Sequence, residues 1–125
     1  MIGYTTIGVT DMERSLTFYD ALLAEVGGKQ VMGMDRIKFY SDESGTGMLA
    51  ICIPYDENEQ HCGNGNMVAI AGGSKEGAKA LYDKAMQLGA SDDGEPGDRA
   101  PFFYGGYVRD FDGNKLCFYH MTLDG

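Results

Sequence analysis

The alternation of apolar and polar residues changes period near the start of the chain. From Thr5 to Val9 it is two, which is typical of a β-strand, with Ile7 and Val9 on one face. Asp11 is a favourable helix N-cap, and after it apolar residues recur every three or four positions, which predicts an amphipathic helix. Gly27 and Gly28 predict the helix end. The expected buried stripe consists of Met12, Leu16, Tyr19, Leu23 and Val26.

Short extended segments follow this first helix. The pattern predicts strands over residues 30–34, 36–40 and 48–54, with a turn rich in Gly, Ser and Asp over 41–47. Residues 55–66 are a polar stretch and predict a linker.

The same pattern then restarts. Residues 67–71 predict a strand with Val68 and Ile70 on one face, Ser74 predicts a helix N-cap, and Gly89 predicts the helix end. The second expected stripe consists of Ala78, Leu81, Tyr82, Ala85 and Leu88.

The last third of the chain predicts a hairpin. Ser91 to Gly97 is polar and rich in turn residues, so a turn is expected there. Two strands over residues 104–109 and 115–121 flank Asp110–Asn114, whose Asp-Gly pair is a strong hairpin signal.

The two halves therefore form an internal repeat of strand, helix and further strands. Asp11 precedes Tyr19 by eight residues, and Ser74 precedes Tyr82 by eight. The predicted fold is α+β, with two tandem βαβββ modules in a single domain over residues 1–125. Module one covers 1–54, the linker 55–66 and module two 67–125.

Composition narrows the classes of partner. The chain has 10 Lys and Arg against 19 Asp and Glu, a formal charge of −9. Nucleic acid and anionic membrane surfaces are therefore not expected partners, because both need clustered basic residues. No apolar run approaches the length of a membrane span, and no signal peptide is visible. Three cysteines without C-x-x-C spacing argue against a disulfide framework or structural zinc site, so a cytoplasmic location is expected.

Three segments, Ile7–Tyr19, Gly89–Arg99 and Phe103–Lys115, carry a resemblance to a known family. In this order, on a doubled βαβββ repeat, they resemble the vicinal oxygen chelate superfamily. That superfamily includes glyoxalase I, bleomycin-resistance proteins and extradiol dioxygenases. The resemblance covers essentially the whole chain and implies a cupped mixed sheet with helices outside, a small-molecule ligand inside and a homodimer.

The resemblance also implies which residues line the ligand-binding pocket. The strand faces turned away from the helices would line the cup with a mixture of small, aromatic and sulfur-containing side chains, which suits a cavity. The expected pocket residues are Tyr4, Thr6, Cys52, Met67, Tyr104, Tyr107, Cys117 and Tyr119.

Metal-dependent members of the superfamily hold a divalent ion with His, Gln or Glu from four strands. Carried onto this chain, those positions fall on Tyr4, near Cys52, on Met67 and on Cys117, none of which is such a residue. No metal and no cofactor is therefore predicted. The three sulfur-containing residues would suit a soft ion such as Cu(I), and the competing interpretation is that they are apolar lining residues. His61 is expected in a solvated loop, and His120 is expected to point away from the cup.

Other side chains leave alternatives open. Arg99 and Arg109 could bind an anionic ligand or pair with carboxylates, the second being favoured. Tyr104 and Tyr107 could contact a ligand or pack. Cys117 as a nucleophile would need charge from Arg109 or Lys115. Adjacent Asp92 and Asp93 are expected to be solvated.

The resemblance and the missing metal ligands lead to two hypotheses about function. The first is a glyoxalase-like small-molecule-binding protein that sequesters a drug or metabolite in the cup without a metal. The alternative is a divergent lyase or isomerase of the glyoxalase type, similar to lactoylglutathione lyase. The missing metal ligands favour the first, and whether the protein is an enzyme is left open.

Overall fold

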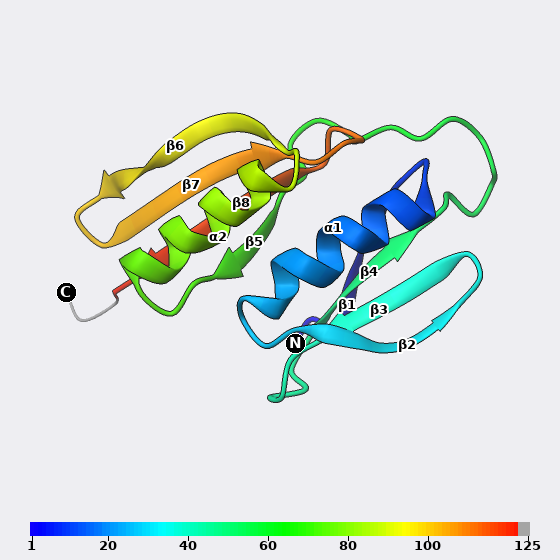
Figure 1. Cartoon of the computed structure of the whole chain (residues 1–125), viewed down its shortest axis with the longest axis horizontal. Coiled ribbons are helices and arrows are strands. Elements are labelled where there is room, and N and C mark those ends of the chain that lie inside the picture. The colour runs from blue at the N-terminus through cyan, green and yellow to red at the C-terminus, as the bar shows by residue number, and fades with distance from the viewer. Residues whose placement is uncertain (123–125) are drawn as a thin grey trace. The chain divides into compact units, whose positions relative to one another are not determined.

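A computed structural model describes residues 1–122. The last three residues of the predicted second module, 123–125, lie outside this range. The described chain reads β1 α1 β2 β3 β4 β5 α2 β6 β7 β8, which is βαβββ twice (Figure 1). This order confirms the predicted α+β fold of two tandem modules. The chain divides into two compact units, one from Met1 to Cys62 and one from Gly63 onward, so the boundary falls within the predicted linker.

The first unit is one helix on a four-stranded mixed sheet (Figure 1). The strand order is β1-β4-β3-β2, with β1 parallel to β4 and the other neighbours antiparallel. Its elements are β1 (Tyr4–Gly8), α1 (Met12–Ala24), β2 (Lys29–Met34), β3 (Ile37–Ser41) and β4 (Met48–Cys52).

Helix α1 begins where predicted but buries a different stripe. The Asp11 carboxylate caps it by accepting from the backbone N–H of Arg14 at 3.1 Å. Phe18 and Leu22, which the predicted stripe omits, are among its most buried residues, because they share a helix row with Ser15 at spacings of three and four. Met12, Leu16 and Val26 are only half-buried. The observed buried face is Ser15, Phe18, Tyr19, Leu22 and Leu23.

The second unit repeats this arrangement, with strand order β5-β8-β7-β6 and β5 parallel to β8. Ser74 caps α2 by accepting from the N–H of Gly77 at 2.9 Å, and four of the five predicted stripe residues are buried. The fifth, Leu88, is the half-buried C-cap residue. The elements are β5 (Val68–Ala71), α2 (Lys75–Gln87), β6 (Ser91–Ala100), β7 (Phe103–Arg109) and β8 (Lys115–Met121).

The turn predicted over Ser91–Gly97 is wrong, because this stretch is the first part of strand β6. It pairs antiparallel with β7, and its register shifts three times, the first between Asp92 and Gly94. These irregularities remove the alternation that identifies a strand from sequence, whereas the backbone hydrogen bonds to β7 hold the segment extended.

The predicted hairpin after β7 is confirmed. Buried Asp110 accepts from the backbone N–H groups of Asp112 and Asn114, each at 2.9 Å. The Asn114 side-chain amide donates to the second oxygen of the same carboxylate at 3.0 Å. This network fixes the register of β7 against β8.

Each helix is tied to its own sheet by a tyrosine–aspartate hydrogen bond. The Tyr40 hydroxyl on β3 donates to Asp20 on α1, and the Tyr82 hydroxyl on α2 donates to Asp92 on β6 at 2.8 Å. Burial, followed by these aspartates, raises the pKa of Tyr40 far above its usual value and that of Tyr82 to about 12. Asp92 is exposed, as expected, and it also accepts this structural hydrogen bond.

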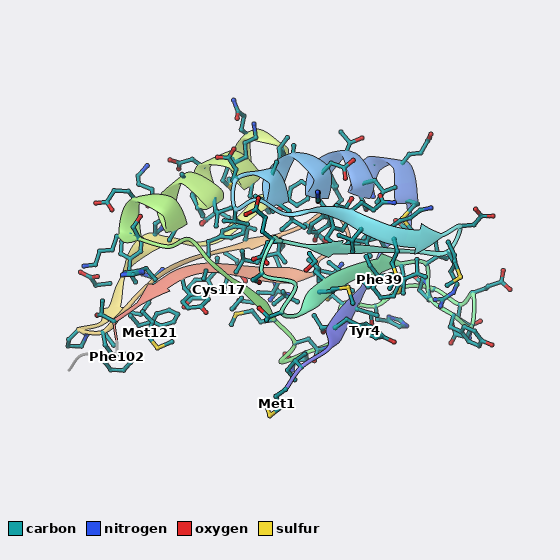
Figure 2. All side chains as sticks on the ribbon, turned by 90° about the horizontal axis from the view of Figure 1, so that it is seen from below. Met1, Tyr4, Phe39, Phe102, Cys117 and Met121 are labelled. Atoms are coloured by element: carbon teal, nitrogen blue, oxygen red, sulfur yellow. The ribbon has the colours of Figure 1, made fainter. Side chains whose placement is uncertain are left out.

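In each unit the helix covers one face of the sheet, and no helix of that unit covers the opposite face among the described residues. In Figure 2 the helix of each unit lies above its sheet, whereas Tyr4 in the first unit and Phe102 and Met121 in the second lie below. Along the described chain, neither helix has the length and apolar character that a membrane span requires.

Candidate ligand-binding face

The face of the second sheet opposite α2 carries most of the predicted site residues of that unit. Alternate residues of β7 and β8 point to it, and the register pairs Tyr107 with Cys117, Gly105 with Tyr119 and Arg109 with Lys115. The residues between them, such as Leu116 and Phe118, are fully buried on the helix side. We call the surface formed by Arg99, Phe103, Tyr107, Arg109, Lys115, Cys117 and Tyr119, with Asp93, the second-sheet face.

At the centre of the second-sheet face, Tyr107 and Cys117 are cross-strand neighbours, and each affects the ionisation of the other. Burial raises the pKa of the Cys117 thiol, and the opposing effects of Tyr107, Lys115 and Arg99 do not outweigh it. Burial and then the neighbouring Cys117 raise the pKa of Tyr107. Both groups are therefore protonated at neutral pH, which disfavours Cys117 as a thiolate nucleophile.

Two cations flank Tyr107. The guanidinium carbon of Arg99 lies 5.3 Å from the ring centroid, and the Lys115 ammonium lies 5.2 Å from it. Both distances are within the range of cation–π attraction. These contacts come from β6 and β8, on either side of β7, so only sheet pairing brings the three residues together.

Asp93 is the one carboxylate on the second-sheet face. It contacts Arg109 Nε at 3.0 Å and the Lys115 ammonium at 3.4 Å. Partial burial opposes ionisation, but Lys115 and then Arg109 outweigh it and lower the pKa of Asp93. Asp93 is exposed, as the sequence predicted, and it also pairs with two cations. Arg109 follows the favoured expectation by pairing with a carboxylate.

Glycines leave room for these side chains. A Cβ on Gly94 would lie 2.9 Å from Tyr107 Cδ2, and Gly94 has a φ of 145°, which disfavours other residues. A Cβ on Gly105 would lie 2.8 Å from Phe103 Cε1. The positions of the Tyr107 and Phe103 rings therefore depend on glycine at both places.

The other end of the second-sheet face is aromatic. The rings of Phe103 and Tyr119 are stacked, with centroids 5.6 Å apart and an interplanar angle of 1°. Met121 and Phe102 extend this end and are exposed (Figure 2). Tyr119 lies four residues after Lys115, or about 13 Å along β8. The face therefore has a cationic end and an aromatic end.

Tyr104 and Met67 are not part of the second-sheet face. Tyr104 lies on the α2 side, where the Lys75 ammonium is 5.8 Å from its ring centroid. It pairs with His120, which also points to that side, as expected from its parity in the sequence. Tyr104 and Tyr107 are an odd number of residues apart, so strand alternation already separates them. Met67 precedes β5 and is exposed.

The three predicted site residues of the first unit lie on the helix-free face of their own sheet. Tyr4 and Thr6 are exposed, and the Tyr4 ring meets Phe39 edge-on at 5.1 Å (Figure 2). Cys52 is buried in a small apolar cluster. Its other members are Ile37, Phe39 and Ala50, with Met48 packed against them.

The residues present do not fit the divalent metal of the superfamily. Tyr4 pairs with Met48 whereas Cys52 pairs with Gly8, so Tyr4 and Cys52 lie at opposite ends of β1 and β4, about 13 Å apart. Among the described residues, no three His, Cys, Asp or Glu side chains come together as a metal site. His61 is exposed, outside any element. The soft-metal combination of Cys52, Met67 and Cys117 draws on both units and stays a prediction.

Comparison with known proteins agrees with the fold. The family model of the Glyoxalase/Bleomycin resistance protein/Dioxygenase superfamily matches residues 1–118. A glyoxalase/bleomycin resistance protein from Albidiferax ferrireducens is 32% identical, with a TM-score of 0.89, over 98% of this chain and 99% of that one. No curated protein matches the chain.

More distant structures share the fold. A putative glyoxalase from Bacillus halodurans is 23% identical, with a TM-score of 0.76, over 95% of this chain and 94% of its own. A family enzyme from Burkholderia phytofirmans is 14% identical, with a TM-score of 0.78, over 96% and 98%. The chain belongs to the glyoxalase/bleomycin resistance protein/dioxygenase superfamily, as its three motifs indicated.

Proposed function

We propose that this protein is a metal-independent small-molecule-binding member of its superfamily and that the second-sheet face contacts the ligand. The observation that carries the proposal is the composition of this face. The Tyr107 hydroxyl and the Cys117 thiol, on paired residues of β7 and β8, share this face with the stacked rings of Phe103 and Tyr119. Aromatic side chains beside a small number of convergent polar groups are the usual make-up of a site that binds a small organic molecule, and this end of the face combines the two.

The first test is a ligand screen by thermal shift with drugs and aromatic metabolites, followed by affinity measurements on the hits. Tyr119→Leu keeps an apolar side chain but removes the stacked ring, so we expect it to weaken binding about tenfold. Tyr55→Leu is the matched control, because Tyr55 is exposed on the segment after β4. A broad library without hits, or hits unaffected by Tyr119→Leu, would count against the proposal.

The glyoxalase-type lyase is the alternative, and the protonated Cys117 and the unsuitable metal positions do not support it. A turnover assay with the hemithioacetal of glutathione and methylglyoxal, with Ni²⁺ or Zn²⁺ added, is expected to show no rate above the uncatalysed reaction. Metal-dependent turnover that is lost on chelation would favour the lyase.

The proposal includes a homodimer, which the family resemblance implies, and a cytoplasmic location, which the cysteine pattern favours. Edge strand β2 supports self-association, because it exposes Val31, Met32 and Met34. Exposed apolar edge strands readily pair with another chain. Sedimentation velocity is expected to give the mass of a dimer for the unmodified chain and of a monomer for Met32→Lys.

A further inference from the structure

The charge of the second-sheet face is opposite to that of the chain. The chain has a formal charge of −9, yet this face carries three cations, Arg99, Arg109 and Lys115. Asp93 pairs with the last two of them. Basic residues are the minority in this protein, so three of them on one sheet face is a local concentration of positive charge that composition does not predict.

The three cations are held differently. Arg109 is anchored, because its Nε contacts Asp93 at 3.0 Å and its Nη1 donates to the Gly113 carbonyl at 3.0 Å. Lys115 reaches the same Asp93 oxygen from farther away, at 3.4 Å. One carboxylate therefore serves two cations and leaves a net positive charge beside Tyr107.

Arg99 is held without a carboxylate. Its Nη2 donates to the backbone carbonyl of Glu95 at 2.6 Å, and its guanidinium lies over the Tyr107 ring. Within residues 1–122 it forms no ion pair. The sequence expectation that Arg99 pairs with a surface carboxylate is therefore wrong, and the alternative of an anionic ligand gains support.

Arg99 and Lys115 also approach the same polar centre. Both lie close enough to the Cys117 sulfur to affect its ionisation. The Tyr107 hydroxyl adjoins this sulfur and is a hydrogen-bond donor. Two cations and a hydroxyl around one point form a suitable environment for anionic oxygen atoms.

We propose that Arg99, Lys115 and the Tyr107 hydroxyl form a subsite that binds the carboxylate or phosphate group of an aromatic ligand. The inference rests on the proposed function, because it assigns the ligand class of the same face. The aromatic end of the face is the reason for proposing that the ligand also carries an aromatic ring. Tyr119 follows Cys117 by two residues, about 7 Å, so a ring attached to the anion can reach the Phe103–Tyr119 stack.

The test titrates the full-length protein with benzoate, phenyl phosphate, inorganic phosphate and neutral benzamide, following amide shifts by NMR. Benzamide matches benzoate in shape but lacks its charge. We expect benzoate or phenyl phosphate to bind more tightly than benzamide, and Arg99→Gln and Lys115→Gln each to weaken the anion about tenfold or more. Benzamide binding is expected to change less than twofold in both variants.

Two controls protect this comparison. Lys79→Gln removes the same charge from α2, where Lys79 pairs with Asp83 at 2.7 Å, and is expected to leave all four affinities unchanged. Arg99→Lys keeps the charge but loses the planar fork, so an intermediate affinity is expected. Amide spectra of each free variant report whether the fold is intact.

The outcomes separate the inference from the proposed function. If benzamide and benzoate bind equally and Arg99→Gln affects neither, the anion subsite is wrong and the small-molecule function stands. If no aromatic compound binds, the subsite for an aromatic anion is wrong, and the broad ligand screen decides the small-molecule function. Inorganic phosphate binding as tightly as phenyl phosphate, and weakened by Arg99→Gln, supports the anion subsite and removes the aromatic ring from the ligand class.

Discussion

At the scale of single residues, the chemistry of the second-sheet face depends on which groups are kept protonated. Cys117 is buried and has a raised pKa even though Arg99 and Lys115 are nearby. From sequence, an activated thiol at this position would need charge from Arg109 or Lys115, and the sequence does not show the burial that opposes it. The balance between burial and charge keeps Cys117 a neutral thiol beside Tyr107.

This protonation state predicts slow thiol chemistry at Cys117. With iodoacetamide at pH 8, Cys117 is expected to alkylate at least about tenfold more slowly than half-buried Cys62, because its thiolate is rarer and less accessible. Peptide mass spectrometry of timed samples measures both rates in one experiment. Cys117 reacting as fast as Cys62 would contradict the assigned protonation state.

At the scale of elements, the corrected stripe of α1 changes which substitutions matter. Leu22 is fully buried, whereas Leu16, which the sequence pattern favoured, is half-buried. The hydrophobic periodicity established that the helix exists, but its rotation about its axis follows from how Phe18 and Leu22 pack on the sheet.

Leu22→Ala is therefore expected to lower the free energy of unfolding by about 2–5 kcal/mol. Leu16→Ala, the same change on the same helix, is expected to have a clearly smaller effect, because less of its side chain is buried. Urea denaturation followed by circular dichroism measures both free energies of unfolding. Equal decreases for the two variants would contradict the observed buried face and favour the stripe predicted from sequence.

The helix–sheet link through Tyr82 makes stability sensitive to alkaline pH. The pKa of Tyr82 rises from 10.0 in its ordinary state to about 12 in the fold, where it donates to Asp92. The folded state therefore holds this proton more tightly. The resulting stabilisation is complete below pH 10 and is lost as the pH rises through about 12.

Tyr82→Phe is expected to be less stable than the unmodified protein at pH 8, by about 1 kcal/mol for the lost hydrogen bond. Between pH 9 and pH 11.5 the free energy of unfolding is expected to fall less in Tyr82→Phe than in the unmodified protein. The pH dependence that comes from Tyr40 is expected to remain in both. Urea denaturation at these pH values is the measurement, with exposed Tyr55→Phe as the control. An unchanged pH dependence in Tyr82→Phe would contradict this role.

At the scale of the whole molecule, the chain uses one βαβββ plan twice and fills the two sheet faces differently. The helix-free face of the first sheet holds an apolar cluster around Phe39, and the second-sheet face holds charged and aromatic groups. In the repeat, Ala50 on β4 corresponds to Cys117 on β8. Ala50 pairs with Thr6 and Cys117 pairs with Ala69, and Thr6 and Ala69 each precede their helix N-cap by five residues. The repeat therefore conserves backbone geometry and not side-chain chemistry.

If the protein works without a metal, chelation is expected to have no effect. Extensive dialysis against EDTA should leave the unfolding temperature and the benzoate affinity unchanged, because no step of the proposed binding uses an ion. Differential scanning fluorimetry and the NMR titration measure the two quantities. A fall in either that Zn²⁺, Ni²⁺ or Cu(I) restores would revive a metal site and, for Cu(I), the option through Cys52, Met67 and Cys117.

The sequence by itself determined the order of elements, the repeat and the superfamily. These features depend on local signals: the caps Asp11 and Ser74, two helical periods and the Asp110–Asn114 hairpin. Such signals act between residues close in the chain, so they can be recognised without a structure.

Only the tertiary structure decided the character of the site. Strand β6 is held extended by its pairing with β7, and this pairing places Arg99 on Tyr107 while β8 brings Lys115 to the same ring. The register of β1 with β4 likewise separates Tyr4 from Cys52. These relations join residues distant in sequence through backbone hydrogen bonds, which carry no side-chain signature. The composition of a binding face therefore follows from sheet register.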